Sequence, residues 1–299
     1  MQNLYEVIKD SLFFNKFILN DLVCVEYTCP LEDEHLAVFT QYDYIIHVLS
    51  GKKSWKTIHG RWTINAGETL FVKKGATVIT QYLEDDFCML GFFLPDDIIR
   101  DSLKDIIKKV ANYNKDSAQK FTATELKHSE YLDIFFQSML TYFRNPEQPP
   151  EAIIKLKLKE LLINIVFNCN DFALASYLML ITENTKPLLP NIMETNFCYN
   201  LNLPEFAKMT HRSLSTFKRD FQRQYNMTPG KWLLAKRLDY AANLLLYNKD
   251  NITNIAFDSG FVDVSHFNRA FKQKFGTTPS TYRKIALSNS KDKYLNFLD

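Results

Sequence analysis

The sequence has little of what marks low-complexity, disulfide-stapled or membrane-spanning proteins. Its 299 residues include only 8 glycines and 10 prolines, too few for a collagen-like or low-complexity architecture. The longest apolar run, Phe172 to Ile181, is about half the ~20 residues that a helix needs to cross a bilayer. The start of the chain also lacks the basic segment, apolar stretch and cleavage site of a signal peptide. We therefore expect a cytoplasmic protein without a membrane segment.

Residues for metal, cofactor or covalent chemistry are equally scarce. The five cysteines are an odd number, widely spaced and without a Cys-x-x-Cys pair, so free thiols fit better than disulfides or a zinc finger. His35, His47 and His59 are isolated, and no His-x-His occurs. The sequence has no phosphate-binding glycine loop, no Gly-x-Ser-x-Gly and no His-Glu-x-x-His. We expect no catalytic residue, no metal and no cofactor.

Apolar residues, by contrast, are abundant, and charge is unevenly distributed along the chain. Hydrophobic residues make up 46% of the chain, enough for sizeable cores, and the length fits about two domains at roughly 150 residues each. The net charge is only +2, but residues 199–284 hold 14 basic and 6 acidic residues, while the remainder holds 22 and 28. A basic third beside an acidic remainder favours a polyanion-binding module joined to another domain. Charge alone leaves open an ordinary solvated basic face.

The basic third contains an internal repeat at an offset of 50 residues. The matching positions are Ser215 and Ser265, Phe217 and Phe267, Arg219 and Arg269, Phe221 and Phe271, Tyr225 and Phe275, Thr228-Pro229 and Thr278-Pro279, and Trp232 and Tyr282. Upstream, Phe206-Ala207 corresponds to Ile255-Ala256 with the offset changed by one residue, which places a length difference in a turn. This repeat is the strongest signal in the sequence.

Each copy of the repeat is predicted to be a helix, a tight turn and a second helix. In the second copy, Ser259-Gly260 breaks a short helix, Asp263 provides the next N-cap, and Gly276 ends that helix. In the first copy Ser213 is the expected N-cap, and Asn226 replaces the terminating glycine. Two helices joined in this way form the unit that places its second helix in the DNA major groove.

The repeat resembles the double helix-turn-helix domain of the AraC/XylS family of bacterial transcription regulators. The residues that carry the resemblance are Ile255-Ala256-Phe257-Asp258-Ser259-Gly260-Phe261, Phe267-Asn268-Arg269-Ala270-Phe271-Lys272 and Phe275-Gly276-Thr277-Thr278-Pro279-Ser280-Thr281-Tyr282-Arg283. Arg237-Leu238 through Leu244-Leu245 resembles the long helix that joins the two subdomains in that family. The first copy departs from the family, because His211 and Arg212 stand in the turn where glycine and an apolar residue are usual.

The resemblance implies which side chains face DNA. The expected DNA-binding residues are Ser215, Lys218 and Arg219 in the first copy and Val264, Ser265, His266, Asn268 and Arg269 in the second. Short polar side chains can reach base edges, arginine and lysine can bind guanine or phosphate, and Val264 offers only apolar contact, for example to a thymine methyl. Lys272 and Lys274 are expected to contact phosphates or to be plain surface.

Residues from about Leu22 to Leu94 are predicted to form short β-strands separated by glycine turns. Gly51, the turn Ala66-Gly67-Glu68 and Gly75 resemble the cupin-like regulatory domain that begins many AraC-type proteins. A small-molecule effector would bind inside such a barrel, and the candidate lining residues are Tyr44, Ile46, Trp55 and Phe71. Ordinary core packing is the alternative for each of them.

Residues from Asp96 to about Ile181 have helical periodicity. One helix carries an apolar stripe that either packs on the barrel or pairs two chains into a homodimer, as in the family: Ile154, Leu156, Leu158, Leu161, Leu162, Ile165 and Val166. The interdomain linker is expected at residues 182–191, which contain Pro187 and Pro190.

The sequence thus predicts a two-domain α+β protein: a cupin-like β-barrel with following helices, then an all-α domain with two helix-turn-helix subdomains joined by a long helix. The expected bounds are 1–181 for the regulatory domain, 182–191 for the linker, 192–286 for the DNA-binding domain and 287–299 for the tail. Within the DNA-binding domain, the first helix-turn-helix is expected at about 202–226, the joining helix at about 229–246 and the second helix-turn-helix at about 252–276.

The expected function is sequence-specific regulation of transcription on double-stranded DNA, as an activator because most members of the family are. A small molecule or a regulatory protein would act on the N-terminal domain, and RNA polymerase would be a partner. Two other functions stay open: a non-specific nucleoid-type DNA binder, and a metal-dependent cupin enzyme fused to a DNA-binding domain.

Overall fold

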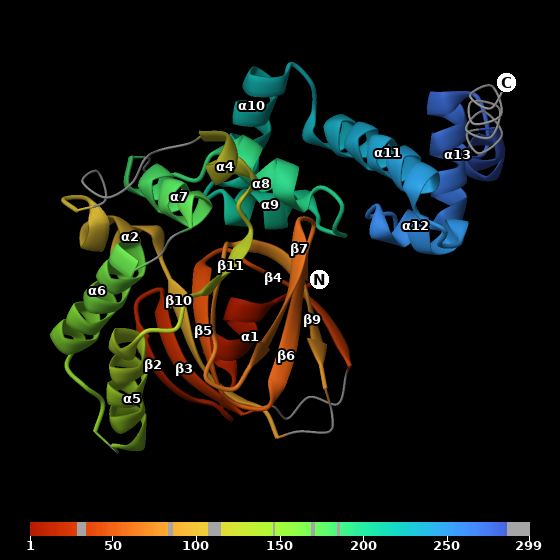
Figure 1. Cartoon of the computed structure of the whole chain (residues 1–299). Helices are drawn as coiled ribbons and strands as arrows, with labels where there is room; N and C mark the ends of the chain where they lie inside the picture. Colours follow the sequence, from red (N-terminus) through yellow and green to blue (C-terminus); the bar gives the residue numbers. More distant parts are fainter. Residues whose placement is uncertain are drawn as a thin grey trace, which may run out of the picture. The chain divides into compact units, whose positions relative to one another are not determined.

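The computed structural model of the chain describes residues 1–28, 34–82, 86–106, 115–145, 147–168, 171–183 and 186–285 (Figure 1). The chain divides into two units, Met1–Thr195 with Met209–His211, and Asn196–Lys208 with Arg212–Asp299. The first unit contains the strands and the second is helical, which confirms the predicted α+β class with two domains. None of the described helices is both long and apolar enough to span a membrane.

The N-terminal unit is built on two sheets that face each other. One has the strand order β1-β4-β9-β6-β7 and the other β11-β8-β5-β10-β3-β2. The strands are β1 (Gln2–Asn3), β2 (Asn15–Leu19), β3 (Leu22–Thr28), β4 (His35–Thr40), β5 (Asp43–Ser50), β6 (Lys52–Thr57), β7 (Gly60–Asn65), β8 (Thr69–Val72), β9 (Gly75–Gln81), β10 (Cys88–Leu94) and β11 (Ala123–Leu126). All pairings are antiparallel except β1 with β4.

The six-stranded sheet is covered on both faces, which explains why its central strands are almost wholly apolar. On β5, Tyr44 and Ile46 point into a core between the two sheets, which the short helix α1 (Leu4–Asp10) also enters. Ile45, between them, points the opposite way, because side chains alternate along a strand.

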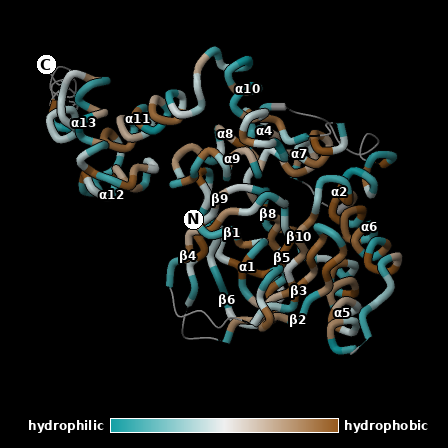
Figure 2. The backbone as a smooth tube through the Cα atoms, turned by 180° about the vertical axis from the view of Figure 1, so that it is seen from behind, coloured by the Kyte–Doolittle hydropathy of each residue, from teal (hydrophilic) through white to brown (hydrophobic). Residues whose placement is uncertain are grey.

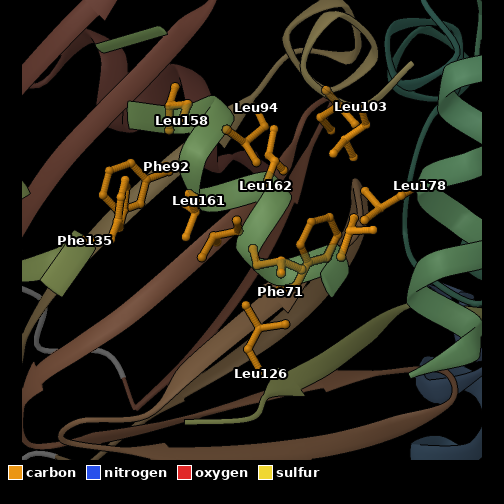
Figure 3. Packing of buried hydrophobic residues seen from close by; sticks show 14 of the residues in the cluster. Phe71, Phe92, Leu94, Leu103, Leu126, Phe135, Leu158, Leu161, Leu162 and Leu178 are labelled. Atoms are coloured by element: carbon orange, nitrogen blue, oxygen red, sulfur yellow. The ribbon is translucent and has the colours of Figure 1, made fainter. Parts of the chain in front are cut away.

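Helices pack on the outer face of this sheet and form the second core of the unit. They are α2 (Asp96–Leu103), α4 (Lys115–Lys120), α5 (Glu130–Arg144), α6 (Glu151–Asn168) and α7 (Phe172–Glu183), followed by α8 (Leu189–Asn196). Figure 3 shows part of this core, where Phe71 and Phe92 from the sheet lie near Leu161 and Leu162 of α6. The backbone of α6 and α7 is coloured mainly hydrophobic in Figure 2, as expected for helices in a packed layer.

Two details of this layer correct the sequence prediction. Ala123–Leu126, within the segment expected to be helical, is the edge strand β11 paired with β8; four residues are too few for periodicity to reveal a strand. In the stripe on α6, six of the seven residues are at most 3% exposed, but Leu156 is 64% exposed. Leu156 lies two residues after Ile154, about 200° around the helix, so it could not share the buried face.

His47 is buried between the sheet and α5. Its Nδ1 lies 2.9 Å from Thr69 Oγ1, and its ring stacks on Phe136 with the ring centres 4.0 Å apart. Burial lowers the pKa of His47 to about 4, with Asp133 acting in the opposite direction. The imidazole is therefore neutral at pH 7.

The C-terminal unit contains two helix pairs, one toward each end of a long helix. The elements are α9 (Leu203–Met209), α10 (Leu214–Tyr225), α11 (Pro229–Tyr247), α12 (Ile252–Asp258) and α13 (Val264–Phe275). The expected linker, 182–191, is partly helical, because α7 reaches Glu183 and α8 starts at Leu189. The expected tail, 287–299, lies outside the described residues.

The sequence repeat is reproduced in the packing of the aromatic rings. Phe221 lies 4.4 Å from Tyr225 and 5.8 Å from Trp232, measured between ring centres. The equivalent distances in the second copy, from Phe271 to Phe275 and to Tyr282, are 4.5 Å and 5.4 Å. The second helix of each copy is therefore held by an equivalent aromatic cluster of its own.

This packing makes Phe271 a core residue whose loss is costly. Phe271→Ala should lower the free energy of unfolding of the helical unit by about 3–5 kcal/mol, because it leaves a cavity around a fully buried ring. Urea titration followed by circular dichroism measures the change. The control is Phe257→Ala, since that ring is 51% exposed; equal effects of the two changes would contradict the assignment.

Candidate DNA-binding surface

Each of the two candidate recognition helices, α10 and α13, has well-defined ends. At the start of α10, Ser213 Oγ accepts a hydrogen bond from the backbone N–H of Thr216 (3.3 Å), and at the start of α13, Asp263 Oδ1 accepts one from Ser265 (2.7 Å). Asn226 and Gly276 end the helices in the left-handed conformation, with φ of 53° and 76°. All four predicted cap positions are confirmed.

The turn before each recognition helix has the same geometry despite different residues. Gly260 has φ of 85°, and the N–H of Phe261 donates to the carbonyl of Ala256 (3.0 Å). In the first copy His211 takes the left-handed conformation with φ of 52°, and the N–H of Arg212 donates to the carbonyl of Ala207 (3.0 Å). His211 thus adopts the left-handed conformation that glycine adopts in the second copy, at some conformational cost. The departure from the family in sequence does not alter the turn.

The outward faces of α10 and α13 have exposed residues at the same four positions, two of them identical. The exposed side chains at spacing i, i+3, i+4 and i+7 are Ser215, Lys218, Arg219 and Gln222 on α10, and Ser265, Asn268, Arg269 and Lys272 on α13. Gln222 was not among the predicted residues; its spacing of four from Lys218 and three from Arg219 is the signal that could have identified it.

Asp220 organises the arginines of the first copy. Its Oδ2 accepts a hydrogen bond from Arg212 Nε (3.2 Å), and its Oδ1 lies 3.8 Å from Arg219 Nε. The side chain of Arg219 remains 68% exposed. Arg212 therefore connects the turn to the recognition helix, while Arg219 stays available at the surface.

Three residues of the second copy that could contact DNA also make contacts within the protein. Val264 is partly buried against the core formed by α11, α12 and α13, and the His266 ring meets the Phe261 ring edge-on, with centres 5.8 Å apart. Lys274 forms an ion pair with Asp239 (2.7 Å) and donates to the carbonyl of Ala235 (2.9 Å). Lys274 therefore fastens α13 to α11.

Arg237, in the middle of α11, connects the two helix pairs. Its Nε donates to the carbonyl of Phe197 and its Nη2 to that of Tyr199, both at 2.7 Å. Gly260 packs against the same segment: a Cβ at this position would lie 2.8 Å from Arg237 Nε and 2.9 Å from the carbonyl oxygen of Cys198. The turn of the second copy is thus braced against the chain that leads into the first.

The candidate effector residues divide between two cores. Tyr44, Ile46 and Trp55 line a cavity of about 90 Å³ between the sheets. Phe71 does not line it: it pairs with Ile45, so both side chains face the helices, and Phe71 lies 5.9 Å from Phe121. The prediction for Phe71 was wrong because the alternation on β8 has to follow that of its neighbour β5.

The cavity has an apolar wall with a few polar groups. The hydroxyl of Tyr44 and Nε1 of Trp55 are buried and interact with each other, and they meet no other hydrogen-bond partner among the described residues. Lys53 is also buried in the wall, with its ammonium 4.8 Å from the ring centre of Tyr27 and 4.2 Å from that of Phe87. Burial raises the pKa of Tyr44 above its usual value, so its hydroxyl is a donor at pH 7. Among the described residues, no group of three His, Cys, Asp or Glu side chains could hold a metal ion.

Comparison with known proteins agrees with this two-part architecture. A family model described as the ExsA N-terminal regulatory domain matches residues 43–177, and one described as a helix-turn-helix domain matches residues 206–285. The virulence regulon transcriptional activator VirF of Yersinia enterocolitica is 25% identical over 268 residues, which are 89% of this chain and 97% of VirF.

Two further relatives match different shares of the chain. The HTH-type transcriptional regulator ExsA of Pseudomonas aeruginosa is 25% identical over 79% of this chain and 84% of its own length. The HTH-type transcriptional activator RhaS of Escherichia fergusonii is 32% identical over 34% of this chain and 38% of its own length. A regulatory domain followed by two helix-turn-helix units on one long helix defines a DNA-binding transcription regulator. The chain belongs to the AraC family of such regulators.

The close approach at Gly260 generates a prediction with a matched control. Gly260→Ala should destabilise the helical unit by more than Gly276→Ala, although both residues have positive φ. The added methyl would overlap Arg237 and the Cys198 carbonyl at position 260, but would meet nothing within 4 Å at position 276. For the strain of positive φ alone we expect about 1–2 kcal/mol. Equal shifts of the urea midpoint in the two variants would show that the brace is not formed.

The exposure of Arg269 generates a prediction for DNA affinity. Arg269→Ala should weaken binding to the specific site by about 1–3 kcal/mol, because a guanidinium contact to base or phosphate is lost. Fluorescence anisotropy with a labelled duplex measures the change, and circular dichroism checks that the fold is intact. Lys249→Ala, in the exposed loop before α12, serves as the control. Unchanged affinity of Arg269→Ala would contradict the assigned face.

Proposed function

We propose that the protein is a sequence-specific activator of transcription whose α10 and α13 enter two neighbouring major grooves of one duplex. The observation that carries this proposal is the matched pair of outward faces, with four exposed residues at the same spacing on each helix. Successive major grooves on one side of B-DNA are about 34 Å apart, and a rigid domain with two recognition helices is suited to this repeat.

The chemistry of the two faces supports reading of bases as well as phosphates. Arg219 and Arg269 fit the guanine edge through two hydrogen bonds, and Asn268 fits the adenine edge. Lys218 suits either guanine or a phosphate, and Lys272 suits a phosphate. Ser215, Ser265, His266 and Val264 remain predicted contacts, with Val264 restricted by its partial burial.

Regulation is proposed to act through the N-terminal unit. The cavity between its sheets is large enough for part of a small molecule, and the Tyr44 hydroxyl in its wall would donate to an acceptor group of such an effector. A regulatory protein that binds the outer surface of this unit is the second candidate, because the relatives in this region are described as a regulatory domain.

Two protein partners complete the proposal. RNA polymerase is the partner that an activator requires, and VirF and RhaS are both described as activators. Pairing of two chains is proposed to use exposed apolar residues of α6, such as Leu156 and Phe167, because the rest of its predicted stripe is already packed in the core. The protein acts on DNA in this proposal and catalyses no reaction.

A competition experiment separates this function from non-specific DNA binding. Footprinting upstream of the neighbouring genes first identifies a site. An unlabelled duplex with that site should then displace a labelled copy roughly 10³–10⁷ times more effectively than a random duplex, as specific regulators do. Equal competition by both duplexes would favour the nucleoid-type alternative. Stoichiometric iron, zinc or manganese in the purified protein would favour the cupin-enzyme alternative.

A further inference from the structure

Two lysines directly after β8 are buried instead of exposed to solvent. Lys73 is 4% exposed and Lys74 is 3% exposed. Lys74 is fully paired: its ammonium contacts Asp96 and lies 3.8 Å from Asp43 Oδ2. Asp43 Oδ1 in turn accepts hydrogen bonds from the backbone N–H of Lys74 and from the Tyr177 hydroxyl, both at 2.7 Å. One ammonium thus holds both nearby carboxylates.

Lys73 has no comparable partner. Its Nζ makes no hydrogen bond to any of the described residues and lies 5.1 Å from the centre of the Tyr177 ring. Burial lowers the pKa of Lys73 to about 7, an effect that Asp43 opposes and Lys74 reinforces. A buried ammonium without a hydrogen-bond partner destabilises the folded protein, and an anion bound next to it would reduce that free-energy cost.

A cavity of about 20 Å³ lies beside Lys73. Its wall is formed by Lys73, Lys74, Asp96 and Tyr177 on one side and by Lys186, Pro187, Leu188 and Asn191, where α8 begins, on the other. The volume exceeds the roughly 10–15 Å³ that one water-sized group needs. Three lysines face Asp96 and the adjacent Asp43, so the surroundings carry a net positive charge when Lys73 is protonated.

Two further features of the cavity favour an anion. The first turn of α8 lines it, and the N-terminal end of a helix carries a partial positive charge. Asn191 is 3% exposed, and its side-chain oxygen has no partner among the described residues. Because the two ends of an asparagine amide are interchangeable, a turned Asn191 would direct an N–H toward the cavity.

We propose that this pocket binds one carboxylate group, with the Lys73 ammonium as its principal ligand. A cation is disfavoured by the lysines, and a large dianion exceeds the volume. The carboxylate belongs either to a small free anion or to the end of a longer molecule that extends out of the pocket. The site is separate from the cavity between the sheets and from the DNA-binding surface, so it does not depend on the proposed function.

Isothermal titration of the full chain with sodium acetate and with sodium octanoate, at constant sodium concentration, tests the proposal. We expect one saturable site per chain for at least one of the two salts. Saturation by acetate alone identifies a small free anion, and equal or tighter binding of octanoate identifies the end of a longer molecule. No saturable binding of either salt would overturn the proposal.

Lys73→Met is the decisive variant, because it removes the charge, keeps a long apolar side chain and replaces a buried unpaired ammonium, so folding is expected to be retained. Carboxylate affinity should fall by at least about tenfold, as for a lost charge-assisted hydrogen bond. The control is Lys56→Met on the exposed face of β6, which should bind like the wild type. Carboxylate binding that persists unchanged in Lys73→Met would place the ligand elsewhere and contradict the assignment. Specific DNA affinity, measured in parallel, should be equal in all three proteins.

Discussion

The contact of one aromatic ring with another determines where the exposed polar side chains of α10 and α13 lie. Phe221 packs on Trp232 and Phe271 on Tyr282, with ring centres 5.8 Å and 5.4 Å apart. Because a helix has a fixed rotation per residue, fixing the inward phenylalanines also fixes the direction of the residues two and three positions away. The polar face of each recognition helix is therefore a consequence of its core, and the duplicated core produces duplicated faces.

The joining helix α11 does not only separate the two helix pairs but also makes contacts that hold them. Arg237 is largely buried, burial lowers its pKa, and its hydrogen bonds go to two backbone carbonyls of the segment before α9. Backbone carbonyls bind a guanidinium without adding a second charge, so the Arg237 side chain ties α11 to the main chain of this segment. Lys274, paired with Asp239, adds a second fastening at the far end of α13. Arg237 thus holds α11 to the segment before α9, and Lys274 holds α13 to α11.

Much of the C-terminal unit could be predicted because its signals are local. Ser213 and Asp263 cap helices through neighbours two or three residues away, and Gly260 is needed by its own backbone angle. His211 could not be predicted in the same role, because a non-glycine residue reveals a left-handed turn only when the surrounding structure is known. Gln222 completes the exposed face of α10 and was not among the predicted residues, although its spacing was visible in the sequence.

The N-terminal unit was harder to predict because its determinants are contacts between distant strands. The orientation of Phe71 depends on its pairing with Ile45, and the strand β11 exists only because β8 offers it an edge. Leu156 looked like part of an apolar stripe until the helix placed it on the other side. Which apolar residue faces which core is a property of sheet pairing and helix phase, and short segments of sequence do not contain it.

The neutral imidazole of His47 makes the N-terminal unit sensitive to acid. Its pKa is about 4 in the folded protein, against 6.5 for an unburied histidine. Between these two values the unfolded chain takes up a proton that the folded chain refuses, so stability is full above pH 6.5 and decreases as the pH falls toward 4. The loss from this one ring reaches on the order of 3 kcal/mol, a sizeable part of the usual margin of a folded domain. The burial of this one ring, stacked on Phe136, thus lowers the stability of the N-terminal unit at acid pH.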